Sequence, residues 1–146
     1  MQIRPVQPTD AQEWLRMRVA LWPDDPERET REVADFLAGK RLVLVEAVFV
    51  CPRSDGALCG LSEVHIKAQA PGCLTDRIGY LEGWYVDPDM RGQGIGRALV
   101  VAAEEWARAK GCTEMASDTS PRNPLSPVAH AALGYTTVAW HFRKEL

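Results

Sequence analysis

Residues 85–99 read YVDPDMRGQGIGRAL, which is a short apolar run, a turn and the beginning of an amphipathic helix. Three glycines stand at alternate positions in this stretch, Gly92, Gly94 and Gly96. Glycine lets a backbone turn sharply and approach a ligand closely. Because the loop precedes a helix, successive N–H groups and the positive helix end converge on one point, which suits a pyrophosphate. Arg91 and Arg97 can add positive charge from the sides.

Two common phosphate-binding motifs do not fit this loop. A Walker loop requires Lys followed by Ser or Thr after its last glycine, and the sequence has neither pair there. A dinucleotide fingerprint requires a third glycine where Arg97 or Leu99 stands. The pattern that does fit is R-x-x-G-x-G, from Arg91 to Gly96. A plain flexible turn is the alternative, but glycines that alternate at the start of a helix favour a binding loop.

Length and composition predict one soluble domain over residues 1–146. The chain has 146 residues, of which 46% are hydrophobic and 25% charged, and its net charge is −3. Such a charge does not favour nucleic acid or an anionic membrane as partner. Neither a signal-peptide core nor an apolar run of ~20 residues is present, so we expect a cytoplasmic protein. The four cysteines form no C-x-x-C pair and are expected to be reduced, and we expect no metal site.

Hydrophobic periodicity and turn residues predict alternating strands and helices. Thr9 and Gln12 are expected to form a capping box for the first helix, which ends before Pro23. Asp25 caps the second helix, which ends at Gly39. Further helices are expected over 94–110 and from Asn123 to residue 132, and strands over 2–6, 42–50, 58–66, 78–86, 113–117 and 135–142. The order β-α-α-β-β-β-α-β-α-β predicts a mixed sheet with helices on its faces.

The R-x-x-G-x-G loop, with Val-Asp-Pro before it and Arg-Ala-Leu after it, resembles the pyrophosphate loop of the GNAT acetyltransferases. The order of elements and Leu133-Gly134-Tyr135 are also similar to that family. The resemblance implies the GNAT fold, an α/β (α+β) domain whose mixed central sheet has a splayed strand pair. It also implies acetyl-CoA as co-substrate, bound by backbone groups of Trp84, Tyr85 and Val86 and by Arg91, Gly92, Gln93, Gly94, Ile95, Gly96 and Arg97.

Three further stretches resemble the aminoglycoside 6′-N-acetyltransferases: residues 21–23 (LWP), 80–83 (YLEG) and 115–121 (MASDTSP). The resemblance implies acetylation of the 6′-amine of aminoglycosides, and with it antibiotic resistance. These substrates are polycations, which need carboxylates for their ammonium groups and flat rings against their sugars. Trp22, Glu82 and Asp118 are the candidates for substrate binding. Each also has a plainer interpretation: Trp22 as core, Glu82 as a solvated strand residue and Asp118 as a turn residue.

The chemistry requires that an ammonium group lose a proton before the amine attacks a thioester. Glu82 or Asp118 could take that proton directly or through water. Many GNAT members have a tyrosine as the acid for the leaving thiolate, three residues before the leucine that corresponds to Leu133, where this chain has His130. We therefore count His130 as a third catalytic candidate, beside a structural role on its helix and a mechanism that rests on proximity alone.

Two other functions fit the same loop. The chain could acetylate another small amine or a protein amine, or it could bind acyl-CoA as a sensor without turnover. A homodimer is also expected, because members of the resembled family often pair through C-terminal strands. Residues 140–142 (WHF) could cover such an edge.

Overall fold

The computed structural model describes residues 2–146 as a five-stranded sheet packed with helices. The sheet follows sequence order, and its first four strands are antiparallel neighbours, whereas β5 pairs parallel to β4. The mixed α/β class is therefore confirmed. The elements are β1 Arg4–Pro5, α1 Ala11–Leu21, α2 Pro26–Leu37, β2 Ala47–Pro52, β3 Leu58–Lys67, β4 Ile78–Val86, α3 Ile95–Ala109, β5 Glu114–Ser117 and α4 Ser126–Ala132, with 3-10 turns at Pro8–Asp10 and Pro88–Met90.

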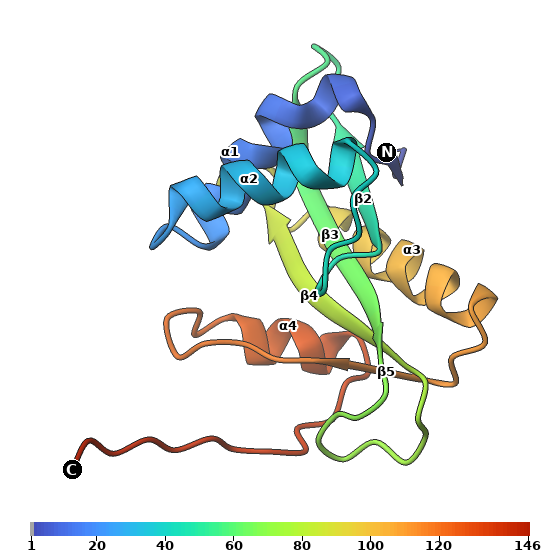
Figure 1. Ribbon diagram of the computed structural model, residues 1–146, viewed down its shortest axis with the longest axis vertical. Coiled ribbons are helices and arrows are strands. Elements are labelled where there is room, and N and C mark those ends of the chain that lie inside the picture. Colours follow the sequence, from blue (N-terminus) through green and yellow to red (C-terminus); the bar gives the residue numbers. More distant parts are fainter. Residues whose placement is uncertain (1) are drawn as a thin grey trace.

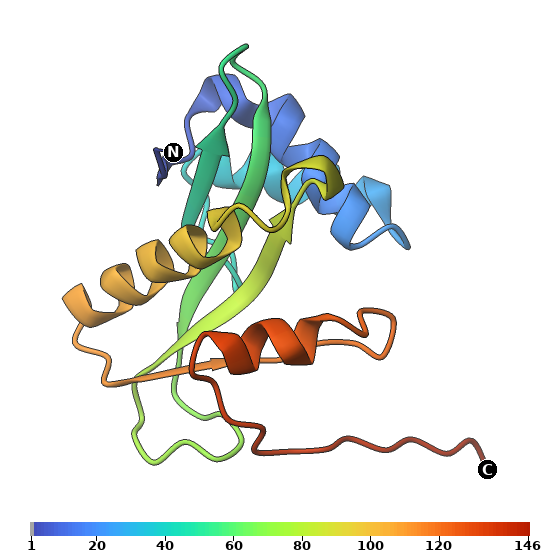
Figure 2. The same cartoon turned by 180° about the vertical axis from the view of Figure 1, so that it is seen from behind.

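Helices cover both faces of the sheet (Figures 1 and 2). Helices α1 and α2 bury Trp14 and Val33 against β2 and β3. On the opposite face, α3 buries Val100 and Ala103 against Val64 of β3 and Leu81 of β4. Leu133 and Tyr135, which follow α4, pack on this second cluster, so α4 shares the face of α3. Burial of these apolar stripes at roughly 25 cal/mol per Å² stabilises the layered arrangement.

Strands β4 and β5 are paired over only part of their length. Their register runs from Ile78 opposite Glu114 to Leu81 opposite Ser117. Beyond Leu81, β4 continues to Val86 beside β3 alone, in the part of the chain that the structure describes. The two strands diverge visibly from that point (Figure 1). The pair is therefore splayed, and the backbone of the second half of β4 borders the gap.

The structure corrects two predictions near the N-terminus and in the first long strand. Helix α1 begins at Ala11. The predicted capping box of Thr9 and Gln12 is not formed; instead the side chain of Asp10 accepts a hydrogen bond from the Gln7 backbone N–H at 2.8 Å. Strand β2 begins at Ala47 and not at residue 42. β-branched content shows that a segment suits a strand, but a neighbour must pair with it. The partner β3 meets β2 only from the Ala47–Val64 pair onward.

The predicted strand over 135–142 is also absent from the described chain. This C-terminal arm, which we define as residues 136–146, runs away from the domain (Figures 1 and 2). Val138, Trp140 and Phe142 are 59%, 79% and 93% exposed. Their alternation is typical of a strand, yet a single copy of the chain pairs no neighbour with them. The prediction of Asp25 as a helix cap is confirmed, since its Oδ1 accepts from Arg28 N at 3.0 Å.

A buried ionic cluster joins α1 and α2 to the sheet. Arg18 Nε lies 2.8 Å from Glu29 Oε2 and 3.5 Å from Glu63 Oε1, and both carboxylates are fully buried. Trp14 Nε1 donates to Glu63 Oε1 at 2.7 Å. Burial raises the pKa of Glu63 to about 7, against the opposing effects of Arg18 and Trp14. The folded protein therefore holds a proton on Glu63 that the unfolded chain releases at a lower pH.

Replacement of Glu63 by Gln should flatten the dependence of stability on pH. Because the folded pKa is raised from 4.5 to about 7, the wild type should lose stability as the pH rises through this window. Glu63→Gln keeps the acceptor for Trp14 but does not titrate. It should therefore avoid the loss of about 1–3 kcal/mol in the free energy of unfolding that the wild type shows as the pH rises. Urea unfolding between about pH 5 and pH 8 measures this, with exposed Glu105→Gln as control. Parallel curves for wild type and Glu63→Gln would contradict the assignment.

Candidate active site

The glycine-rich loop connects β4 to α3 with two left-handed residues. Gly92 has φ +75° and Gly94 has φ +83°, and Gly94 stands directly before the first residue of α3. The first N–H groups of a helix have no acceptor inside it, so the geometry of the loop and the start of α3 suits an anion. Trp84 Nε1 donates to the Gly96 carbonyl at 3.1 Å and fixes the helix against β4. This confirms the loop geometry that the sequence predicted.

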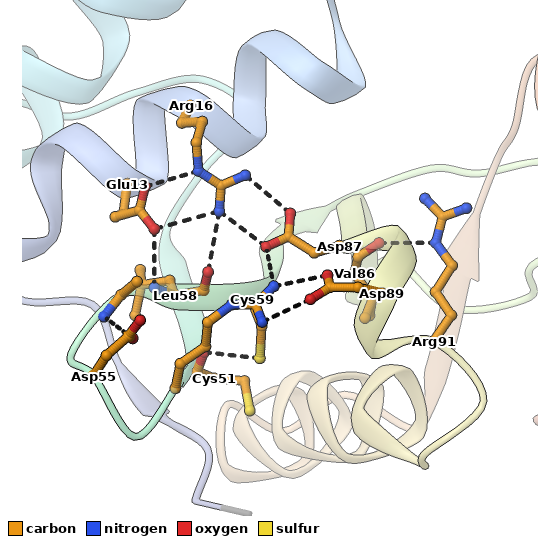
Figure 3. A network of polar contacts seen from close by, with 12 residues as sticks. Glu13, Arg16, Cys51, Asp55, Leu58, Cys59, Val86, Asp87, Asp89 and Arg91 are labelled. Atoms are coloured by element: carbon orange, nitrogen blue, oxygen red, sulfur yellow. Dashed lines mark hydrogen bonds and ion pairs between the residues drawn. The ribbon is translucent and has the colours of Figure 1, made fainter.

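A charged network anchors the beginning of the loop (Figure 3). Asp87 is buried and accepts from Arg16 of α1 and from Arg53 of the β2–β3 connection, each at 2.9 Å. Arg53 also donates to Asp89 at 2.8 Å. Burial acts to raise the pKa of Asp87, but the hydrogen bonds from Arg16 and Arg53 together lower it below its ordinary value. Neither arginine was predicted from the sequence, because partners so distant in the chain leave no local pattern.

The two arginines of the loop have different positions. Arg91 is exposed and donates through Nε to the Val86 carbonyl at 2.9 Å. Arg97 donates to the Ala132 carbonyl at 3.1 Å and so ties α3 to α4. The role of Arg97 in joining two helices was not predicted. Both arginines lie next to the glycine-rich loop, to which they were expected to add positive charge.

A cavity of about 580 Å³ lies at the point where β4 and β5 separate. The connection between α1 and α2, strand β4, the end of β5 and helix α4 all contribute to it. It brings together every residue that the sequence analysis selected for substrate binding or catalysis. These are Trp22, Glu82, Asp118 and His130, and Trp84 and Ser117 also line it.

Two of the four carboxylates that line the cavity, Glu82 and Asp118, are held from behind by buried donors of the sheet. Glu82 Oε2 lies 2.9 Å from Nε2 of His65, which is 2% exposed. A carboxylate only accepts, so this nitrogen carries the proton. The Tyr80 hydroxyl donates to Asp118 Oδ2. Burial, followed by Asp118, raises the pKa of Tyr80, so the phenol keeps its proton. His65 and the role of Tyr80 were not predicted from the sequence, because both act through contacts between different segments.

Trp22 forms one wall of the cavity and is half-buried. Its ring lies over the guanidinium of Arg18, 5.3 Å from the ring centroid. Its other close neighbour is Gly83, where an added Cβ would lie 2.9 Å from the Trp22 ring. Glycine is therefore needed at residue 83 for the ring to approach β4. Trp22 has one surface held by the buried Arg18 and another that borders the cavity.

His130 links α4 to the end of β5. Its Nδ1 lies 2.8 Å from the Ser126 carbonyl, and its Nε2 lies 2.9 Å from Ser117 Oγ. The ring also meets Trp84 edge-on at 5.3 Å. Ser117 was not selected from the sequence, because nothing local distinguishes it from the other serines of the same stretch.

Several other features bear on the chemistry. Within residues 2–146 we find no group of three or more His, Cys, Asp or Glu that could hold a metal ion. Cys51, Cys59, Cys73 and Cys112 are free thiols. None of the helices described is long and apolar enough to cross a membrane.

The class of protein follows from the loop, the splayed strands and a family comparison. Residues 11–135 match the model of the Acetyltransferase (GNAT) family. The chain therefore belongs to the GNAT family.

Within that family the chain groups with the aminoglycoside N(6′)-acetyltransferases. It is 48% identical to the aminoglycoside N(6′)-acetyltransferase type 1 of Klebsiella aerogenes over 99% of this chain and 96% of that protein. The solved complex of aminoglycoside N-acetyltransferase AAC(6′)-Iy with CoA has a TM-score of 0.84 and 31% identity, over 99% of this chain and 95% of that one. The complex of AAC(6′)-Iy with the bisubstrate analogue CoA-S-monomethyl-acetylneamine has a TM-score of 0.83 and 32% identity, over 99% and 98% of the two chains.

An alanine in place of Gly94 should weaken CoA binding. The backbone there has φ +83°, a conformation that costs a residue with a side chain about 1 kcal/mol, so alanine should shift the backbone and tilt the N–H groups of the loop. We expect Gly94→Ala to raise the Kd for CoA about tenfold, as measured by calorimetry. Gly56→Ala is the matched control, because Gly56 has φ +88° in the β2–β3 turn with nothing within 4 Å of the added Cβ. Equal affinity in both variants would contradict a role of the loop in binding.

Proposed function

We propose that this chain transfers the acetyl group of acetyl-CoA to the 6′-amine of aminoglycosides, and that this activity gives antibiotic resistance. One observation carries the proposal: a single cavity beside the splayed strands has four carboxylates in its lining, Glu82 and Asp118 among them, and an indole wall. The relatives support it, since AAC(6′)-Iy binds both CoA and an acetylneamine analogue joined to CoA. The acceptor and the thioester would meet where β4 leaves β5.

The proposed cofactor site uses backbone more than side chains. The Trp84, Tyr85 and Val86 segment of β4 borders the gap beyond Leu81, so its peptide groups can bind the amides of pantetheine. A backbone N–H near Tyr85 or Val86 would meet the oxyanion of the tetrahedral intermediate. The pyrophosphate would lie on the N–H groups at the start of α3. Its binding loop consists of Arg91, Gly92, Gln93, Gly94, Ile95, Gly96 and Arg97.

The proposed acceptor site is electrostatic. Glu82 and Asp118 would bind ammonium groups of the aminoglycoside, and Trp22 would pack against a sugar ring. His65 and Tyr80 hold the two carboxylates in place through one oxygen each. A carboxylate that already accepts a hydrogen bond keeps further lone pairs for a cation. The arrangement therefore favours recognition of a polycation over recognition of a neutral sugar.

The first test is release of CoA thiol from acetyl-CoA across matched acceptors. Compounds with a 6′-amine should react, and compounds with a 6′-hydroxyl should not, because an alcohol is a far poorer nucleophile. Polyamines and peptides with a free amine serve as controls. Reaction with these controls alone would indicate another acceptor, and CoA binding without any reaction would indicate a sensor.

Loss of the charge of Glu82 or Asp118 should weaken binding of the aminoglycoside without changing binding of acetyl-CoA. Glu82→Gln and Asp118→Asn each remove a charge-assisted hydrogen bond of about 1.5–3 kcal/mol, so kcat/KM for the aminoglycoside should fall about 10- to 100-fold. KM for acetyl-CoA should stay near that of the wild type. Exposed Glu105→Gln on α3 is the matched control. Unchanged kcat/KM in both cavity variants would refute the acceptor site.

We also propose that the chain is a single domain that works in the cytoplasm as a homodimer. The C-terminal arm supports the dimer, because Val138, Trp140 and Phe142 alternate along an extended backbone and are exposed. A second copy of the chain is the proposed partner for these apolar side chains, since such a row is costly to leave in water. In the described chain, β5 is paired only with β4, so its outer edge is open to an added strand.

Removal of the apolar side chains of the arm should therefore yield a monomer. We expect Trp140→Ser with Phe142→Ser to halve the mass measured by light scattering behind a sizing column. Val43→Ser is the control, because Val43 is 89% exposed but lies before β2, outside the arm. A dimer that survives the double substitution would refute pairing through the arm, and a monomeric wild type would refute the dimer.

A further inference from the structure

Ser117 occupies the point where the two splayed strands separate. It is the last residue of β5 and the last that pairs with β4, opposite Leu81. Its hydroxyl oxygen lies 2.9 Å from His130 Nε2, 3.1 Å from the Leu81 carbonyl and 3.4 Å from the Asp118 carbonyl. Ser117 and His130 both line the cavity that holds Glu82 and Asp118. A hydroxyl, an imidazole and two carboxylates therefore surround the same space.

The hydrogen bonds of His130 determine where its proton lies. Nδ1 is 2.8 Å from the Ser126 carbonyl, and a carbonyl only accepts, so Nδ1 carries a proton. The Ser126 hydroxyl, 3.2 Å away, shares this proton as a second acceptor. In the neutral imidazole, Nε2 is consequently bare and accepts from the Ser117 hydroxyl. In the imidazolium, Nε2 donates to Ser117 Oγ, and the serine proton turns to the Leu81 carbonyl. Both protonation states of His130 are thus fully hydrogen-bonded.

The other candidate acids and bases have partners of their own. One oxygen of Glu82 accepts from His65, and one oxygen of Asp118 accepts from Tyr80, so each carboxylate has one oxygen engaged by the sheet. The Tyr135 hydroxyl donates to Glu104 at 3.2 Å. Burial, followed by Glu104, raises the pKa of Tyr135, so this phenol is a poor proton donor. The bare Nε2 of His130, reached through Ser117, is the better-placed proton acceptor.

We propose that Ser117 is a catalytic residue that exchanges protons with the reacting atoms, and that His130 stores the proton in between. This inference rests on the proposed function and assigns the proton transfers of that reaction. The carboxylates then bind the ammonium groups of the acceptor, and the Ser117–His130 pair moves the proton. The charged groups that line the cavity with His130 are Asp24 and Asp25 at the start of α2, Arg28 on α2, Glu82 on β4, Asp118 after β5 and Arg122 before α4. Arg97 of α3 is bonded to the last residue of α4.

The steps balance in atoms and electrons. The acceptor ammonium first releases one proton to solvent and reacts as the neutral amine. This amine forms its C–N bond to the acetyl carbonyl and passes an N–H proton to Ser117 Oγ, while the serine proton moves to His130 Nε2. The tetrahedral intermediate then collapses, the C–S bond breaks and the electron pair stays on sulfur. The imidazolium returns its proton through Ser117 to the thiolate. The products are the acetamide and CoA thiol, and Ser117 and His130 regain their initial states.

Single-turnover acetylation of a 6′-amine aminoglycoside tests this assignment, because it reports the chemical step alone. Ser117→Ala and His130→Gln should each slow this rate by about 10²-fold or more, with little change in the Kd of either substrate. Glutamine preserves a hydrogen bond to Ser117 but cannot store a proton. Ser117→Thr keeps the hydroxyl and should retain the rate to within about threefold. Because the two residues act as one unit, Ser117→Ala with His130→Gln should be no slower than either alone.

The control and the pH profile separate catalysis from structure. Ser62→Ala removes another buried strand hydroxyl, one bonded to the Leu99 carbonyl at 3.0 Å outside the cavity, and should leave the rate unchanged. Besides the acid limb that the acceptor ammonium gives in every variant, the rate profile should show a second acid limb that disappears in His130→Gln and persists in Glu82→Gln and Asp118→Asn. Wild-type rates in Ser117→Ala or His130→Gln, or loss of that limb in a carboxylate variant alone, would overturn the proposal. A wild type that acetylates no 6′-amine would instead refute the proposed function, and with it this inference.

Discussion

The early end of the β4–β5 pairing is the constraint on which the rest of the site depends. Four residue pairs hold the strands together, and after Leu81 and Ser117 they diverge. A continuous pair would use the peptide groups of residues 82–86 within the sheet and close the cavity. Because the pairing stops, β4 can offer backbone to a ligand on one side while β3 still holds it on the other. The same divergence places Glu82, Asp118 and Ser117 around one space.

Buried polar groups make this opening rigid. Two arginines donate to Asp87 and so hold the beginning of the glycine-rich loop in place. His65 holds Glu82, and the guanidinium of Arg18 packs against the Trp22 ring. Burial of a charge is costly unless it is paired, so these groups stabilise a defined geometry more than they stabilise the fold. Glu63 shows the cost directly, since burial raises its pKa to about 7 despite Arg18 nearby. The apolar clusters on both faces of the sheet supply the stability that offsets such costs.

How much the sequence predicted depends on how local the determinants are. The Gly92–Gly96 loop, the Asp25 cap and the long helix α3 each follow from neighbouring residues, and each was predicted within a few positions. Glu82, Asp118 and His130 were selected one by one, and the element order brought them into one cavity. His65, Arg18 and Ser117 were missed, because their roles come from contacts between segments far apart in the chain. The predictions of strands over 42–46 and 135–142 were wrong for a related reason. The β propensity belongs to single residues, whereas a strand also needs a neighbouring strand to pair with.

The acidic groups of the cavity differ in how firmly they are held. Asp24 pairs with Arg122 at 3.0 Å, but both side chains are more than 70% exposed. Such a surface pair contributes about 0–1 kcal/mol, so it exchanges readily with water or with another cation. Glu82 and Asp118 are instead bound by groups of the sheet that are almost fully buried and cannot leave. Glu82 and Asp118 therefore keep a fixed geometry at the point of strand divergence, whereas Asp24 adds a charge that can change its partner. That difference suits a ligand with many ammonium groups, because only one of them has to be held beside a thioester.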